Sequence, residues 1–290
     1  MQSLRQINVP PLWQRGLAGY GVRVGVVGTG IDLSHPDLRN ATIDVFSVIA
    51  NDPRTDDFAG HETGVVWLIN RIAPRASVIV AKDRNQSYGF IASAIDACEK
   101  LRHLGVHVIN LSFASPSATD GTDPLSREVN YLVEHGIIVV AAAGNGGPRL
   151  QTIASPGAAE LALTVGKVNA HDVVDNRSSR GPTLDGRLKP DCVAPGVQIT
   201  AAIPTAFGRG RYAMFDCTSY ATPHVTGLIA LLREAYPDVA PAALKWAVMR
   251  SCDAARIPFL SRASNPRWLT GAGRANGYHA YECLRNEQSK

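Results

Sequence analysis

The 290-residue sequence predicts an α/β fold: a doubly wound parallel sheet with helices on both faces, in three α/β/α layers. Two observations support this prediction. Short, nearly continuous apolar runs rich in Val and Ile recur along the chain, and such runs are typical of strands buried on both faces. Segments with helical spacing of apolar residues separate these runs, and regular strand and helix alternation favours parallel strands joined by crossover helices.

The first half of the chain shows the alternation most clearly. Val22 to Val27 forms a β-branched run that ends in Gly28-Thr29-Gly30, which indicates a strand followed by a tight loop. The further strands predicted in this half are 76–82, 106–114 and 136–144, and the helices between them are 61–72, 90–104 and 123–135. Each helix follows or precedes a strand closely, as in a sheet covered on both faces.

The second half is predicted to complete the sheet and to add long helices. Strands are expected at 161–168 and 192–203, followed by a helix from about Thr222 to Tyr236. Pro237 ends that helix, and Pro241 fits the first turn of the next one. We expect the terminal stretches 1–8 and 284–290 to be frayed.

The composition indicates one globular domain covering residues 1–290. The chain is 45% hydrophobic, long enough to bury a substantial core, and has no internal repeat or low-complexity linker. Its 29 basic and 25 acidic residues give a net charge of +4 without a basic block, so a nucleic-acid partner is not indicated.

The cysteines and the N-terminus indicate where the protein works. The five cysteines are widely spaced and include no Cys-x-x-Cys pair, so we expect buried free thiols rather than a zinc site or a disulfide framework. The first residues contain no apolar signal core, and no stretch approaches the roughly 20 apolar residues of a membrane span. These features predict a cytoplasmic protein without a membrane partner; no cofactor is predicted.

Three residues with complementary chemistry lie at predicted element ends. His61 starts a helix, Asn145 follows a strand, and Ser219 stands at the head of a buried helix. Each has an ordinary structural explanation by itself, because Ser commonly caps helices and Asn-Gly commonly forms turns. Together they supply a nucleophile, a base and an amide donor for an oxyanion, which acyl transfer through a covalent intermediate requires.

Seven segments, taken in order, resemble those of one enzyme family. They are GVRVGVVGTGIDLSHPDL, GHETGVV, VINLSFASP, VVAAAGNGG, SSRGPTLDGRLKPDCVAPGVQI, TSYATPHVTGLIALL and GAGRANGYHAYECL. The chain resembles the subtilisin-like serine peptidases (subtilases, peptidase family S8) over about residues 8–282. The resemblance implies a subtilisin-like fold and a peptidase activity.

The resemblance also implies roles for individual residues. Ser219 would be the nucleophile and His61 the general base and acid, while the Asn145 side chain and the Ser219 backbone N–H would form the oxyanion hole. The expected substrate-binding residues are Ser112, Phe113 and Ala114, which would pair with the substrate backbone, and Ala143 and Gly144, which would border an open, uncharged primary pocket.

One position departs from the family at the centre of the chemistry. The triad aspartate of the family belongs at Gly28, so another acid would have to orient His61. We rank the candidates Asp32, Asp57 and then Glu62. Asp32 lies on the loop expected to border His61, whereas the side chains of neighbouring helix residues diverge by about 100°, which would point Glu62 elsewhere. A Ser-His dyad and a non-catalytic relative remain alternatives.

Other departures concern the surroundings of the site. Glu62 and Gly64 replace the Gly and the second His of the family's histidine box, and Cys217 and Tyr220 replace the Gly and Met that flank Thr-Ser. Asp37 lacks the rest of the calcium cage found in secreted subtilases, so we predict no metal there.

The first matched element starts at residue 7, which indicates a mature domain without a signal peptide or a pro-domain. The sequence thus predicts a serine endopeptidase with a non-standard or incomplete triad that acts on a restricted intracellular peptide or protein. Two alternatives stay open: a pseudoprotease that binds a peptide without cleaving it, and a cyclase or transpeptidase that uses the same acyl-enzyme.

Overall fold

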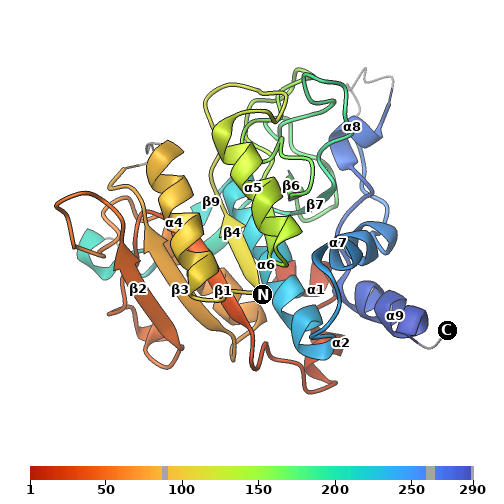
Figure 1. Ribbon diagram of the computed structural model, residues 1–290. Coiled ribbons are helices and arrows are strands. Elements are labelled where there is room, and N and C mark those ends of the chain that lie inside the picture. Colours follow the sequence, from red (N-terminus) through yellow and green to blue (C-terminus); the bar gives the residue numbers. More distant parts are fainter. Residues whose placement is uncertain (87–90, 209, 259–264, 289–290) are drawn as a thin grey trace.

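The computed structural model describes residues 1–86, 91–208, 210–258 and 265–288. Seven parallel strands form one sheet in the order β2-β3-β1-β4-β5-β6-β7 (Figure 1). The strands are β1 (Arg23–Gly28), β2 (Ile43–Ser47), β3 (Ser77–Lys82), β4 (Val108–Leu111), β5 (Ile138–Ala142), β6 (Leu163–Val168) and β7 (Cys192–Pro195). The order runs outward from β1 in both directions, as in a doubly wound sheet.

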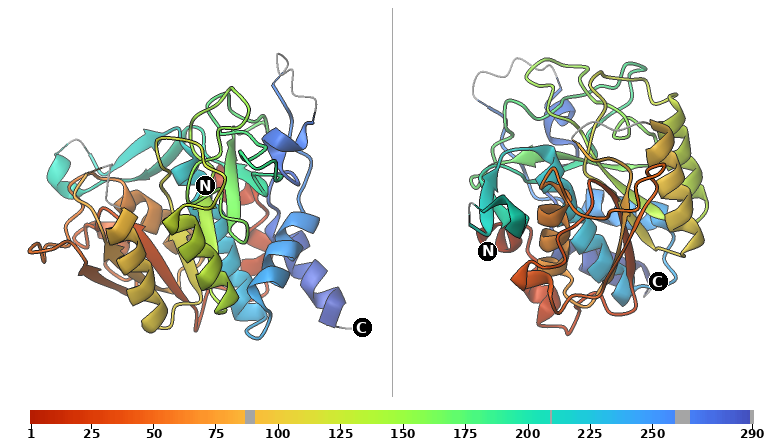
Figure 2. Two further views of the ribbon diagram at one scale, coloured as in Figure 1. Left: turned by 45° about the horizontal axis from the view of Figure 1, so that its top comes forward. Right: turned by 90° about the vertical axis from the view of Figure 1, so that its left-hand side faces the viewer.

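Helices cover both faces of this sheet, which confirms the predicted three-layer α/β/α fold. One face carries α4 (Ile91–His103) and α5 (Pro124–Glu134); the other carries α3 (Glu62–Ile72) and α6 (Thr218–Ala235) (Figures 1 and 2). The remaining helices are α1 (Gln2–Gln6), α2 (Pro10–Trp13), α7 (Pro241–Arg250), α8 (Arg267–Thr270) and α9 (Gly277–Gln288), with 3₁₀ turns η1 (Pro36–Leu38) and η2 (Thr205–Phe207).

The continuous apolar strands fill two cores. On β3, Val78 and Val80 pack with α3 and α6, whereas Ile79 and Ala81 pack with α4 and α5. Successive side chains point to opposite faces of a strand, so a strand buried on both faces needs apolar residues at every position. In the described part of the chain, no helix is both long enough and apolar enough to cross a bilayer.

Several predicted boundaries were wrong. Segment 192–203 forms two strands, because β8 (Ile199–Ala202) leaves the main sheet and pairs antiparallel with β9 (Tyr212–Phe215). Strand β2 was not predicted; it lies at the edge of the sheet and is only half-buried, so its apolar signal is weak. The predicted start of α4 at residue 90 lies outside the described residues.

The prediction of frayed ends was also wrong for residues 2–6 and 284–288, whereas residues 289–290 lie outside the described residues. Residues 2–6 are helical and α9 continues to Gln288. Leu4, Ile7 and Leu284 are buried in the core that contains α6, and this burial holds both terminal segments against the fold.

Close packing of α3 against α6 brings the candidate site together. Gly227 on α6 faces Ile72 on α3, where an added Cβ would lie only 2.7 Å from the Ile72 Cβ. The missing side chain allows the helices to approach closely. The N-terminal ends of the two helices, which carry His61 and Ser219, therefore open on the same cavity.

Candidate active site

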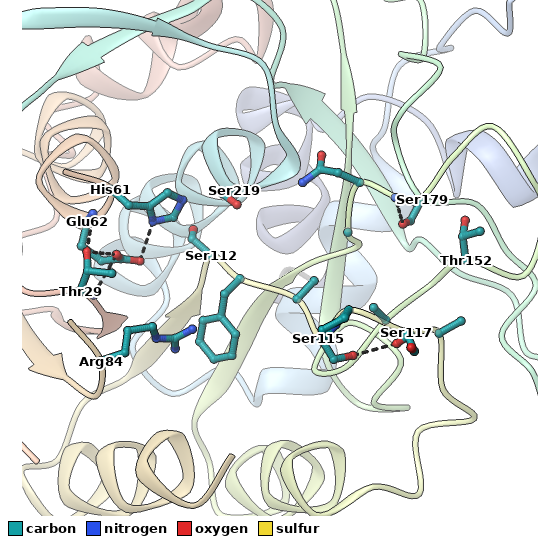
Figure 3. A pocket seen from close by; sticks show the side chains of 18 of the residues that line it. Thr29, His61, Glu62, Arg84, Ser112, Ser115, Ser117, Thr152, Ser179 and Ser219 are labelled. Atoms are coloured by element: carbon teal, nitrogen blue, oxygen red, sulfur yellow. Dashed lines mark hydrogen bonds and ion pairs between the residues drawn. The ribbon is translucent and has the colours of Figure 1, made fainter. Parts of the chain in front are cut away.

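A cavity of about 690 Å³ collects the residues that the sequence singled out. His61, Asn145 and Ser219 line it together with Ser112 to Ala114 and Gly144 (Figure 3). These residues come from the start of α3, the end of β4, the end of β5 and the start of α6. Ligand sites of parallel α/β sheets are expected at the carboxyl ends of the strands, where these segments lie.

Ser219 is the second residue of α6, and the helix begins at Thr218 rather than at the predicted Thr222. Its backbone N–H is therefore among the first N–H groups of a helix, which have no acceptor within the helix. The side-chain oxygen of Asn145 accepts a hydrogen bond of 3.0 Å from the Thr218 N–H, which leaves the Asn145 NH₂ group to serve as a donor. A carbonyl oxygen held beside Ser219 can thus meet two N–H donors and the positive end of a helix.

The acid partner of His61 is Glu62, its neighbour in sequence. Nδ1 of His61 lies 2.9 Å from Oε1 of Glu62 (Figure 3). The His61 side chain keeps 29% of its surface exposed, whereas the Glu62 carboxylate is almost fully buried. A carboxylate only accepts hydrogen bonds, so Nδ1 carries the hydrogen and the other ring nitrogen, Nε2, is the basic atom in neutral His61.

Gly28 provides the space that the Glu62 carboxyl occupies. A Cβ added at Gly28 would lie far inside van der Waals contact with the carboxyl carbon of Glu62. The second carboxylate oxygen, Oε2, accepts hydrogen bonds from the N–H of Thr29 at 3.0 Å and from its hydroxyl at 2.7 Å. The Glu62 carboxylate therefore stands where a side chain at position 28 would project.

The predicted ranking of the acids was therefore wrong in placing Glu62 last. His61, the N-cap of α3, has helical backbone angles, so its Cβ and that of Glu62 do diverge. The Glu62 side chain is nevertheless long enough to turn back toward the end of β1, into the space beside Gly28. The sequence signal was the simultaneous presence of Gly28 and Glu62.

The carboxylate of Asp32, the first-ranked acid, forms hydrogen bonds with residues other than His61. Its carboxylate accepts hydrogen bonds from the N–H and hydroxyl of Ser34 and, at 2.7 Å each, from the N–H and hydroxyl of Thr205. These bonds tie the loop after β1 to η2. Although burial opposes it, this set of donors lowers the Asp32 pKa. Asp32 thus fixes a loop next to the site and does not contact His61.

Asp57, the second-ranked acid, stands at the start of α3. It accepts hydrogen bonds from the backbone N–H groups of Gly60 and Thr63, both at 2.8 Å, and from the Thr63 hydroxyl at 2.7 Å. These donors include N–H groups that the helix itself cannot satisfy. Asp57 consequently holds the turn that presents His61 and Glu62.

The electrostatics favour the charged form of His61. Burial works against the imidazolium, but the negative charge of Glu62 and hydrogen bonds with Glu62 and Cys217 raise the pKa of His61 to about 10. Burial would raise the Glu62 pKa, yet the charges of His61 and Arg84 and the bond from Thr29 hold it below its usual value. The site therefore stabilises the imidazolium that forms when a histidine takes up a serine proton.

Cys217 belongs to the same array, which the sequence did not predict. It is the N-cap residue of α6, and its thiol interacts with both His61 and Ser219. Burial opposes the thiolate, but hydrogen bonding to His61 and its positive charge lower the Cys217 pKa. The Cys217 thiol is thus a direct neighbour of both the proposed base and the proposed nucleophile.

Most of the predicted substrate-binding residues line the cavity. Ser112, Phe113, Ala114 and Gly144 do so, whereas Ala143 is fully buried against Ile153 and Ala158 and does not reach the cavity. Ala143 directly follows β5 and packs in this small apolar cluster, and the backbone turns only at Gly144, where φ is +105°. Thr29, Arg84, Thr152 and Ser179 also line it and were missed.

Arg84 also lines the cavity, and it lies beside Phe113. Its guanidinium lies 3.9 Å from the centre of the Phe113 ring (Figure 3). The guanidinium also forms a two-point ion pair with Asp83, with distances of 2.6 and 2.7 Å. No sequence motif marks this residue, because its place depends on the strand order that puts β3 next to β1.

The Asp37 carboxylate, where we predict no metal, is engaged by protein donors. It accepts hydrogen bonds from Trp67 Nε1 at 2.7 Å, Arg71 at 2.9 Å and the Tyr212 hydroxyl at 3.0 Å. The hydrogen bond from Trp67 lowers the Asp37 pKa most; burial opposes the shift, and Tyr212 and the charged Arg71 add to it. No group of three metal-binding side chains occurs among the residues that the structure describes.

Residues 19–273 match the model of the subtilase family (peptidase S8). The chain belongs to the subtilase family. It is 35% identical over 248 residues to M-protease of Shouchella clausii and to subtilisin BL of Lederbergia lenta, in each case over 81% of this chain. The serine protease AprX of Bacillus subtilis is 32% identical over 268 residues and 79% of this chain.

The matched length of these subtilases varies. The alignment spans 60% of M-protease and of AprX, and 85% of subtilisin BL. Two solved structures have the same fold at lower identity: the prenylagaramide maturation protease PagA, with a TM-score of 0.78 and 22% identity, and a mutant of the protease domain of PatA, with a TM-score of 0.75 and 23% identity. They cover 95% and 92% of this chain, and the matches span 98% and 96% of those chains.

Proposed function

We propose that this subtilase is a serine endopeptidase whose triad consists of Ser219, His61 and Glu62. The observation that carries the proposal is the place of the Glu62 carboxylate: it bonds Nδ1 of His61 and fills the space beside Gly28. Glu62 would thus replace an acid at position 28 from a different element. The Ser-His dyad and the non-catalytic relative are the alternatives that the labelling test separates from this proposal.

The proposed chemistry follows from these positions. His61 Nε2 takes the proton of Ser219 as its hydroxyl oxygen attacks the peptide carbonyl, and Glu62 stabilises the resulting imidazolium. The Asn145 NH₂ group and the Ser219 N–H stabilise the negative charge on the carbonyl oxygen. His61 then gives the proton to the leaving amine, and water resolves the acyl-enzyme; an amine in place of water would give transpeptidation instead.

The substrate is proposed to be a restricted set of peptides or proteins. An extended peptide would pair with Ser112 to Ala114 as an added strand. The Arg84 and Phe113 pair on the wall limits the shapes that can lie in the cavity. All five cysteines are free thiols, which supports a reducing compartment such as the cytoplasm.

The first test is covalent labelling of the nucleophile. Intact-protein mass spectrometry after incubation with a fluorophosphonate should show one adduct on the wild type, located at Ser219, and none on Ser219→Ala. His61→Ala and Glu62→Gln should label much more slowly. A folded wild-type protein that stays unmodified would overturn the catalytic proposal and favour a peptide-binding groove.

Substrate restriction has a separate test. Digestion of a peptide library derived from whole-cell protein should yield cleavage at a small fraction of its peptide bonds, sharing a narrow sequence pattern. Cleavage after many unrelated residues at low enzyme concentration would contradict the restriction while leaving the peptidase proposal intact.

A further inference from the structure

The hydroxyl of Thr29 lies between two buried carboxylates. Its oxygen is 2.6 Å from Oδ1 of Asp57 and 2.7 Å from Oε2 of Glu62. The three residues are only 3%, 3% and 1% exposed, respectively, so bulk water contributes little to their hydrogen bonding. A hydroxyl has one hydrogen to donate. The two carboxylates therefore compete for the same hydrogen.

Asp57 cannot turn away from this contact. The same oxygen that faces Thr29 accepts the Gly60 N–H, and the other oxygen accepts both the N–H and the hydroxyl of Thr63. These donors fix the orientation of the Asp57 carboxylate. They also lie on either side of His61 and Glu62 in the sequence, so Asp57 is anchored to the segment that carries the base and its acid.

We propose that Asp57 is a positioning residue of the catalytic array, which acts on Glu62 through the shared hydroxyl of Thr29. This inference rests on the proposed function, because it concerns the acid that orients His61. Thr29 holds the Glu62 carboxylate in place with its N–H and its hydroxyl, and Asp57 limits how much of that hydroxyl hydrogen Glu62 receives. The charge of Asp57 also adds to the negative potential at His61.

Other charged groups face Glu62 from neighbouring elements. His61 pairs with it directly, and Arg84, at the end of β3, lowers its pKa. Asp83 next to Arg84 is a third buried acid, and burial raises its pKa to about 6, with a further contribution from the charge of Glu62. Arg84 therefore offsets part of the negative charge, whereas Asp57 is connected to Glu62 by a hydroxyl that conservative variants can remove or retain.

The test compares Thr29→Val, Thr29→Ser and Asp57→Asn. The titration of His61 is followed by NMR of its ring in a Ser219→Ala background, and the pH dependence of fluorophosphonate labelling is followed with Ser219 present. Thr29→Val should raise the His61 pKa by roughly 0.5 to 1 unit, because Glu62 loses a donor and becomes a stronger partner for the imidazolium. Asp57→Asn should lower it by a similar amount, because a negative charge is lost.

Thr29→Ser is the matched control and should leave the titration unchanged, since it keeps the hydroxyl. Melting temperatures show whether each variant folds, and the two Thr29 variants leave the Asp57 bonds to α3 intact. If activity falls in all variants while the His61 titration stays fixed, Asp57 and Thr29 have only structural roles and the inference is wrong. Shifts of Thr29→Val and Asp57→Asn in the same direction would also overturn it.

Failure of the proposed function gives a different result. A wild-type protein that does not react with the fluorophosphonate removes the catalytic role, whereas the NMR titration still measures whether Asp57 and Thr29 control the state of His61.

Discussion

At the scale of single residues, Gly28 and Glu62 are complementary in space although they lie far apart in the sequence. Gly28 has no side chain, and the Glu62 carboxylate fills the space beside it and bonds His61. Changing either residue by itself would be damaging: an acid at 28 would collide with Glu62, and a glycine at 62 would leave His61 without an acid. The pair keeps a buried carboxylate on Nδ1 of the histidine.

This complementarity predicts the outcome of moving the acid from position 62 to position 28. Glu62→Gly should lower kcat by about 10⁴, comparable to the roughly 3 × 10⁴ loss when subtilisin loses its triad aspartate. Gly28→Asp should be inactive or unstable because of the collision with Glu62. The double variant Gly28→Asp, Glu62→Gly should recover a large part of the lost activity. Kinetics of all four proteins would measure this coupling, and additive losses in the double variant would contradict it.

The raised pKa of His61 predicts an alkaline pH profile. The base must be neutral to accept the Ser219 proton, so kcat/KM should rise with pH until it passes the His61 pKa, which is raised to about 10. Glu62→Gln removes the charge that favours the imidazolium, so the acidic limb should move to lower pH while the plateau falls by about 10⁴. If the rise of kcat/KM with pH occurs at the same pH in Glu62→Gln as in the wild type, Glu62 does not act on His61.

At the scale of elements, the site depends on how loops and helix ends are anchored. The start of α3 is held by Asp57, the start of α6 by Asn145, and the loop after β1 is tied to η2 by Asp32. These anchors come from different segments, so each fixes one catalytic element against another part of the fold. Asp32 contributes to the frame of the site rather than to its proton transfers.

Replacement of Asp32 should therefore leave the chemistry largely intact. Asp32→Asn keeps an oxygen that can accept from Thr205, and we expect kcat and the acidic limb of the pH profile to change little, with a small fall in melting temperature because the contact is exposed. The measurement is a full pH profile beside that of Glu62→Gln. A loss in kcat as large as that of Glu62→Gln would restore Asp32 as the acid.

At the scale of the whole molecule, the parallel sheet gathers the site from distant parts of the chain. Thr29 follows β1, Asn145 follows β5, and the helices that begin near His61 and at Thr218 pack on the same face. The two hydrophobic cores extend across the two faces of the sheet. Buried packing therefore holds the strands and helices that carry the site residues. In the described residues, Asp37 is held by Trp67, Arg71 and Tyr212.

This construction predicts a stability that does not depend on calcium. Added Ca²⁺ should leave the melting temperature unchanged, and a chelator should not lower it, because the Asp37 carboxylate is already occupied by three protein donors. Thermal unfolding with millimolar Ca²⁺ and with EDTA measures this. A large rise in melting temperature with Ca²⁺ would show that the folded protein binds the ion, since such binding stabilises the folded state by mass action.

The sequence by itself determined the fold class, the family and the positions of Ser219, His61 and Asn145. Strand burial, helix periodicity and the order of the motifs follow from local sequence patterns, so they can be recognised in the sequence. The tertiary structure decided which acid meets His61, where α6 begins, that Ala143 faces the core, and that Thr29, Arg84 and Cys217 join the site. These depend on contacts between segments distant in the sequence, above all on the space that Gly28 leaves for Glu62, and a space of this kind exists only once β1 and α3 have packed together.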